Sequence, residues 1–225
     1  MPSVPDKILA LFDLDLTLLP HDSDELWVRF LLEEDVLDRR YEASNRAIVA
    51  RYGRGEVGAL EFTEFYLGAL TPFTQDELAR WHETFMRRKI VPVIPQAARE
   101  LTAKHRDAGH LVVLTTATSR FLSAPIAREL GFVHLIATEP EVEDGRYTGR
   151  VQGVPNIREG KVDRLLAWLD LRGETLSDFR ESWFYSDSRN DLPLLSRVTH
   201  PVAVNADPVL AEHARNKGWP MLRIA

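Results

Sequence analysis

The sequence predicts an α/β fold: a doubly wound, mostly parallel sheet that carries an inserted helical unit. Nearly continuous apolar runs are typical of strands buried on both faces of a parallel sheet, and they lie at residues 7–13, 111–114, 183–185 and 201–204. Helical patterns separate the later runs, at residues 96–107, 121–130 and 159–169. This alternation indicates βαβ units, and residues 20–91, which show only helical signals, interrupt it.

The interrupting segment follows the first strand directly. Aromatic and aliphatic stripes at helical spacing predict about four short helices that pack on one another. Thr74 and Glu77 form a capping-box signature before one of these stripes. We therefore expect an α/β core made of residues 1–19 and 92–225, with a helical cap domain at residues 20–91.

The chain after the insertion contains one further local signal. The segment Glu143, Asp144 and Gly145 lies between residues 141–142 and 147–151, which have strand character. Such an Asp-Gly turn between two short strands predicts a β-hairpin.

Composition narrows the class of protein. The 225 residues are 44% hydrophobic and 28% charged, which is typical of a folded globular chain. The net charge of −6 comes without any block of Lys or Arg, so neither nucleic acid nor an anionic membrane is an expected partner. No cysteine is present, which excludes disulfides and thiolate metal sites. Residues 1–7 show no secretory leader, and we expect a cytoplasmic monomer or homodimer.

Polar side chains follow the predicted strands at the edge where ligands bind in such sheets. Asp13 and Asp15 come after the first strand, Thr115 after the second, and Asp187 and Asp191 after the third. Several carboxylates that converge on one edge cannot all stay ionised without a cation. Because the candidate ligands are hard oxygens, with neither cysteine nor paired histidines, we expect Mg²⁺.

A hydroxyl and a lysine at the same edge suit a phosphoryl group. Thr115 would donate a hydrogen bond to its oxygens, and Lys161, near the start of the helix at residues 159–169, would supply a fixed positive charge. Of two aspartates spaced by one residue, one can attack phosphorus and the other can protonate the leaving alkoxide. Thr116 is a rival for Thr115, which we prefer because it directly follows the apolar run.

Four motifs together resemble the haloacid dehalogenase superfamily, in its phosphoserine-phosphatase-like branch with a helical cap. The chain is also similar to the histidinol-phosphatase-like enzymes of that branch. The resemblance covers the core nearly end to end, and the motifs occur in the family's order. They are Phe12-Asp-Leu-Asp-Leu-Thr-Leu-Leu19, Leu114-Thr-Thr-Ala117, Glu159-Gly-Lys161 and Tyr185-Ser-Asp-Ser-Arg-Asn-Asp191.

The resemblance implies a Mg²⁺-dependent phosphatase that forms an aspartyl-phosphate on Asp13. Asp13 would also bind the metal, as would Asp187 and the main-chain carbonyl of Asp15, while Asp191 would lie just behind the metal ligands. The side chain of Asp15 would act as the acid and base. Lys161 and Thr115 would hold the phosphoryl oxygens, and Leu14 belongs to the same phosphate-binding set.

Two other functions are weighed against a phosphomonoester hydrolase. One is a phosphotransferase on the same fold, and the other is a non-catalytic protein that binds a phosphorylated ligand. The complete set of four motifs favours catalysis. Asp15 argues against dehalogenation, because a halide leaves without a proton and needs no acid at that position, whereas an alkoxide does.

The substrate depends on the cap, where the chain departs from phosphoserine phosphatases. Asp22 is a candidate for the acidic specificity residue of that branch, although it could instead cap the next helix together with Glu25. Residues 62–70 contain no arginine for a substrate carboxylate, so histidinol phosphate is at least as good a candidate as phosphoserine. Leu16 stands where members of the branch often have Asn.

Overall fold

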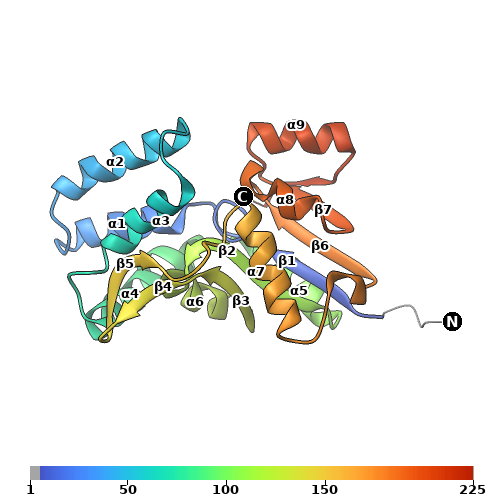
Figure 1. The fold of residues 1–225 in the computed structure, drawn as a ribbon, viewed down its shortest axis with the longest axis horizontal. Coiled ribbons are helices and arrows are strands. Elements are labelled where there is room, and N and C mark those ends of the chain that lie inside the picture. Colours follow the sequence, from blue (N-terminus) through green and yellow to red (C-terminus); the bar gives the residue numbers. More distant parts are fainter. Residues whose placement is uncertain (1–5, 225) are drawn as a thin grey trace.

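The structure, a computed structural model, describes residues 6–224 and is built around one parallel sheet (Figure 1). The six strands lie in the order β3-β2-β1-β6-β7-β8, and every neighbouring pair is parallel. This confirms the predicted fold class. Residues 1–5, on which most of the leader prediction falls, lie outside the described part. The strands of the sheet are β1 (Ile8–Phe12), β2 (Leu111–Ser119), β3 (His134–Thr138), β6 (Glu181–Ser186), β7 (His200–Val204) and β8 (Met221–Leu222).

The two faces of the sheet carry separate hydrophobic clusters. Successive side chains of a strand point to opposite faces, so Leu9 and Leu11 join one cluster while Ala10 and Phe12 join the other. The first cluster contains side chains of α7 (Glu159–Asp170), α8 (Leu192–Leu195) and α9 (Pro208–Lys217). The second contains side chains of α5 (Gln96–Asp107) and α6 (Arg120–Glu129). The sheet is therefore covered on both sides, as its apolar runs predict.

Four helices occupy the interval between β1 and α5. They are α1 (Ser23–Glu33), α2 (Arg40–Gly53), α3 (Ala59–Gly68) and α4 (Gln75–Phe85). The predicted capping box of α4 is present, because Thr74 Oγ1 accepts the Glu77 N–H at 3.3 Å and the Glu77 carboxylate accepts the Thr74 N–H at 2.8 Å. A π-helical turn (Met86–Ile90) and a 3-10 turn (Val91–Val93) then lead back to the core.

The inserted helices share the core of the sheet. The Trp27 ring of α1 packs edge-on against Phe85 of α4 at 5.1 Å between centroids, and against Phe121 of α6 at 5.5 Å. Phe85 is fully buried and belongs to the same cluster as Phe12 of β1. Helices α1 and α4 are thus continuous with the core, and Leu67 of α3 (Ala59–Gly68) joins the same cluster, whereas α2 lies farther from the sheet (Figure 1). The division into cap and core at residues 20–91 stays a prediction.

A β-hairpin lies where the turn chemistry predicts it, formed by β4 (Pro140–Glu143) and β5 (Arg146–Val151). Its two loop residues, Asp144 and Gly145, have φ of 48° and 75°, the left-handed pair that a type I′ turn requires. Strands β3 and β8 and helices α8 and α9 are not predicted by the sequence analysis. Among residues 6–224 there is no helix long and apolar enough to cross a bilayer.

Replacing Phe85 by Ala should lower the free energy of unfolding by about 3–5 kcal/mol, because it removes a fully buried ring of α4 that packs on Trp27 and Phe30 of α1. Urea unfolding followed by both circular dichroism and tryptophan fluorescence should show one transition in the wild type and in the variant. The control is Val133→Ala, whose side chain is 87% exposed and which should shift stability by less than about 0.5 kcal/mol. An early separate transition of the inserted helices would contradict a shared core.

Candidate active site

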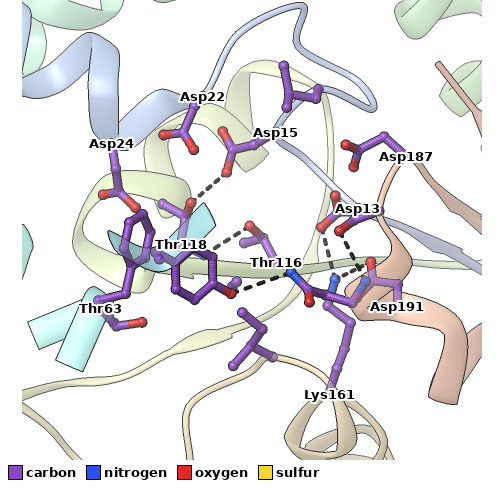
Figure 2. A pocket seen from close by; sticks show the side chains of 17 residues that line it. Asp13, Asp15, Asp22, Asp24, Thr63, Thr116, Thr118, Lys161, Asp187 and Asp191 are labelled. Carbon is purple, nitrogen blue, oxygen red and sulfur yellow. Dashed lines mark hydrogen bonds and ion pairs between the residues drawn. The ribbon is translucent and has the colours of Figure 1, made fainter. Parts of the chain in front are cut away.

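A cavity of about 160 Å³ lies at the carboxyl ends of β1 and β6. The chain order switches direction between these neighbouring strands, which is where open α/β sheets bind ligands. Figure 2 shows the acidic side chains and Lys161 converging on it. The lining residues are Asp13, Asp15, Leu16, Asp22, Asp24, Tyr52, Phe62, Thr63, Thr116, Ala117, Thr118, Ile157, Lys161, Asp187, Ser188, Asn190 and Asp191.

A tight loop after β1 turns both Asp13 and Asp15 into the cavity. The Leu14 carbonyl accepts the N–H groups of Thr17, Leu18 and Leu19 at 3.3, 2.8 and 3.0 Å. The Leu14 side chain is fully buried in the core and does not line the cavity. Of the predicted phosphate-binding set, Leu14 could therefore contribute only through its main chain.

Leu16 lies at the tip of the same loop in a left-handed conformation, with φ of 58°. Asn and Gly adopt this conformation more readily than Leu. Leu16, at a position where members of the branch often have Asn, is therefore a strained residue. The Leu16 carbonyl accepts a hydrogen bond from Asn205 Nδ2 at 3.1 Å, which helps to hold the strained residue in place.

Lys161 joins the strand ends through buried ion pairs. It lies in the first turn of α7, is only 2% exposed, and its Nζ is 3.0 Å from Asp13 Oδ1 and 2.7 Å from Asp191 Oδ2. Ser186 Oγ donates to the same Asp191 oxygen at 2.7 Å. Burial acts to lower the pKa of Lys161, but the charges of Asp13 and Asp191 outweigh it and the pKa is raised. The ammonium therefore stays charged.

The turn before Lys161 requires glycine at position 160. A Cβ on Gly160 would lie 2.3 Å from the Pro155 carbonyl oxygen, a distance at which the backbone must move. The absence of a Cβ at Gly160 thus lets the backbone pass close to the Pro155 carbonyl, in the turn that brings Lys161 to Asp13.

Two carboxylates flank Thr17, which suggests where a cation would sit. Thr17 Oγ1 is 3.3 Å from Asp13 Oδ2 and 3.2 Å from Asp187 Oδ1, and it accepts the Asp187 N–H at 2.9 Å. Within residues 6–224 no cluster of three or more His, Cys, Asp or Glu side chains forms a metal site. Two carboxylates completed by main-chain oxygen and substrate nonetheless fit the oxygen ligands that Mg²⁺ prefers.

The carboxylates at this end are held in an environment that disfavours their charge. Burial, followed by the charges of Asp13 and Asp191, raises the pKa of Asp187 to about 9. Burial also raises the pKa of Asp13 and of Asp191, although Lys161 opposes it in both cases. One lysine does not balance three carboxylates, so a bound cation would stabilise their ionised forms.

Asp15 is held apart from the ion network. Its Oδ1 accepts the Ser23 N–H at 2.8 Å and its Oδ2 accepts the Thr118 hydroxyl at 2.5 Å. Burial raises the pKa of Asp15, and these hydrogen bonds only partly oppose it. A carboxyl with a raised pKa can carry the proton that a general acid must donate near neutral pH.

The structure corrects the preference for Thr115 over Thr116. Side chains alternate along β2, so Thr115 points to the face that carries Val113, where its hydroxyl accepts from Asn156 Nδ2 at 3.1 Å. Thr115 is fully buried and does not line the cavity, whereas Thr116 does. Thr116 is therefore the better candidate for a phosphate ligand.

Asp22 both caps a helix and lines the cavity. Its carboxyl accepts the Glu25 N–H at 3.0 Å as the N-cap of α1. Burial, and then the charge of Asp15, raises the pKa of Asp22 to about 7. Both interpretations of this residue from the sequence are thus compatible with its position.

Several lining residues are not singled out by the sequence analysis, among them Thr118, Asp24, Tyr52 and Phe62. Thr118 has a signal in the sequence, since it lies two residues after Thr116 and thus on the same face of β2, and Asp24 lies two residues after Asp22. Tyr52 and Phe62 had none, because their place depends on how α2 and α3 fold over the sheet.

The pKa of Asp22 generates a prediction for stability. In metal-free buffer the folded protein retains a proton on Asp22 up to about pH 7, while the unfolded chain loses it near 3.8, so this residue lowers stability as pH rises through that window. Asp22→Asn removes the titration and keeps a good N-cap. Relative to wild type, its free energy of unfolding should therefore increase between pH 4 and pH 8 in urea titrations. Parallel pH profiles of the two proteins would contradict the raised pKa.

Comparison with known proteins agrees with this geometry. The family model described as haloacid dehalogenase-like hydrolase matches residues 10–196. A histidinol-phosphatase of Neisseria meningitidis serogroup C is 41% identical over 96% of this chain and 98% of its own length. A phosphoserine phosphatase of Mycobacterium tuberculosis is 33% identical over 97% of this chain and 71% of its own.

Among solved structures, a protein of unknown function from Bordetella pertussis Tohama I superposes with a TM-score of 0.94. It is 49% identical to this chain, and the match covers 97% of this chain and 99% of that one. The family model matches most of the chain. The two relatives named as phosphatases align with nearly its full length. The chain therefore belongs to the haloacid dehalogenase-like hydrolases and is a phosphatase.

Proposed function

We propose that this phosphatase hydrolyses a small phosphomonoester, with Mg²⁺ as cofactor and Asp13 as the nucleophile. The observation that carries the proposal is the contact between Asp13 and the buried ammonium of Lys161 at 3.0 Å, beside a separately held Asp15. Lys161 offsets the charge of the nucleophile as it meets the anionic substrate. A cytoplasmic location and a monomeric or dimeric state remain expectations.

The reaction divides into two displacements. In the first, an Asp13 oxygen forms a bond to phosphorus as the bond to the leaving oxygen breaks, and Asp15 gives that oxygen a proton. In the second, Asp15 takes a proton from water, which attacks the same phosphorus and releases phosphate and the free Asp13 carboxylate. Thr116 and Lys161 would hold the phosphoryl oxygens through both steps.

Mg²⁺ would be held by the carboxylates of Asp13 and Asp187 and by the Asp15 carbonyl. When bound, it would neutralise charge on the phosphoryl group and on these carboxylates. Asp191, engaged with Lys161 and Ser186, keeps the lysine oriented.

The substrate is proposed to be the phosphate ester of a small amino alcohol. The relatives named a histidinol-phosphatase and a phosphoserine phosphatase support this class. The cavity is also small, about 160 Å³, and residues of the inserted helices α1, α2 and α3 line it.

Activity should require Mg²⁺. Hydrolysis of 4-nitrophenyl phosphate should fall to background after chelation and dialysis, and should return on addition of Mg²⁺. Ca²⁺ should restore little, because its larger and more irregular coordination misaligns the attack. Full activity in chelator would contradict the metal assignment.

Asp13→Asn should fold normally and lose at least about 10³-fold in kcat, because an amide is a poor nucleophile. The matched control is Asp163→Asn, an exposed aspartate on α7, which should retain wild-type activity. If the Asp13 variant kept more than a tenth of kcat, a loss of only about 1.4 kcal/mol, Asp13 would not be the nucleophile.

Gly160→Ala should reduce kcat/KM by at least about tenfold, since the clash with the Pro155 carbonyl displaces Lys161 by a fraction of an ångström or more. Gly68→Ala in α3 is the control, because a Cβ there meets no other atom within 4 Å. It should leave activity intact and add up to about 1 kcal/mol of stability. Equal activity in both variants would show that the position of Lys161 does not depend on Gly160.

A further inference from the structure

One end of the cavity is not used by the proposed phosphoryl transfer. Lys161, Asp13, Asp187 and Asp191 occupy the other end, while Asp24 and Thr63 lie beyond Asp15 (Figure 2). The residues of this second end come from the inserted helices α1, α2 and α3. Because Asp15 would protonate the leaving oxygen, the second end faces the leaving group.

The charge of the cavity is strongly one-sided. Six of its lining side chains are aspartates, and Lys161 is the one Lys or Arg among those lining it in residues 6–224. Lys161 is committed to Asp13 and Asp191 at the phosphoryl end. A carboxylate on the leaving group would therefore find no cationic partner at this end, whereas a cation would stabilise the ionised forms of Asp22 and Asp24.

The two acidic residues at this end differ in what they already contact. Asp22 accepts the Glu25 N–H as the helix cap at 3.0 Å. The Thr118 hydroxyl lies beside Asp24, but it donates its single proton to Asp15 at 2.5 Å. The Asp24 carboxyl, which points into the cavity in Figure 2, therefore keeps its oxygens for a ligand.

An aromatic pair lines the same end. The rings of Tyr52 and Phe62 are stacked with centroids 4.2 Å apart and planes inclined by 24°. Behind them, the hydroxyl of Tyr66 is buried without a hydrogen-bond partner in the described chain, and its pKa is raised by burial and by the charges of Asp22 and Asp24. Aromatic faces favour flat groups and cations, so the rings of Tyr52 and Phe62 complement a planar cation better than a neutral aliphatic chain.

We propose that Asp24, Tyr52 and Phe62 form a subsite for a planar nitrogen cation, of the imidazolium type, on the leaving alcohol. The same subsite rejects leaving groups that carry a carboxylate. This inference rests on the proposed phosphatase function and assigns specificity to residues outside the four motifs.

Four phosphate esters separate the features of the leaving group. We choose 2-(imidazol-4-yl)ethyl phosphate for the ring alone, phosphoethanolamine for an ammonium alone, phosphoserine for an ammonium with a carboxylate, and 4-nitrophenyl phosphate for a neutral ring. Wild type should prefer the imidazole ester to phosphoethanolamine, and phosphoserine should be the poorest of the three metabolite-like esters.

Asp24→Asn should lower kcat/KM for the imidazole ester at least tenfold more than for 4-nitrophenyl phosphate, mainly through KM. It should also narrow the gap between phosphoserine and phosphoethanolamine, since it removes one repelling charge. Phe62→Leu should lower kcat/KM for the imidazole ester more than for phosphoethanolamine. Asp76→Asn is the control, because Asp76 holds the same first-turn position in the exposed start of α4.

Equal effects of Asp24→Asn on all four esters would overturn the subsite, as would a wild-type preference for phosphoserine. A preference for phosphoethanolamine over the imidazole ester would overturn the planar-cation assignment. If wild type did not hydrolyse 4-nitrophenyl phosphate with Mg²⁺, the phosphatase proposal itself would fail, which is a separate outcome.

Discussion

The contact on which the rest of the site depends is the buried ammonium of Lys161 between Asp13 and Asp191. Three segments far apart in sequence meet there: the end of β1, the start of α7 and the turn after β6. A buried lysine is tolerated because both carboxylates accept hydrogen bonds from its ammonium group. Without the lysine, an ionised Asp13 or Asp191 would be a buried, unpaired charge. The contact thereby sets the position of the nucleophile, and it explains why a residue without a Cβ precedes Lys161.

The excess of carboxylates gives the cavity its chemical character. Burial and mutual repulsion raise the pKa values of Asp13, Asp187 and Asp22, so these carboxyl groups favour their protonated forms, and a bound cation would favour the ionised forms. The same electrostatics has two consequences at the two ends. At the phosphoryl end it favours a divalent metal, and at the leaving-group end it favours a cationic alcohol, with Asp15 between them as the proton donor.

Much of the fold and part of the site could be predicted from the sequence because both follow local rules. Apolar runs identified four of the six sheet strands, and the strand-end rule indicated Asp13, Asp15 and Asp187, which the structure brings to one cavity. The outer strand β3 and the two-residue strand β8 carry weaker apolar patterns. Proximity to the apolar run favours Thr115, whereas side-chain alternation along β2 brings Thr116 to the cavity. Tyr52 and Phe62 depend on long-range packing of α2 and α3, which no local pattern encodes. The roles of the site residues stay predictions.

The proposed mechanism requires that the phosphoryl group is transferred to Asp13 before it reaches water. The most direct test is a rapid acid quench during turnover, followed by borohydride reduction, which converts an acyl-phosphorylated aspartate to homoserine, and peptide mapping by mass spectrometry. We expect homoserine at position 13, formed at least as fast as steady-state turnover. Phosphate release in a single turnover without modification at position 13, or with modification at another aspartate, would contradict Asp13 as the nucleophile.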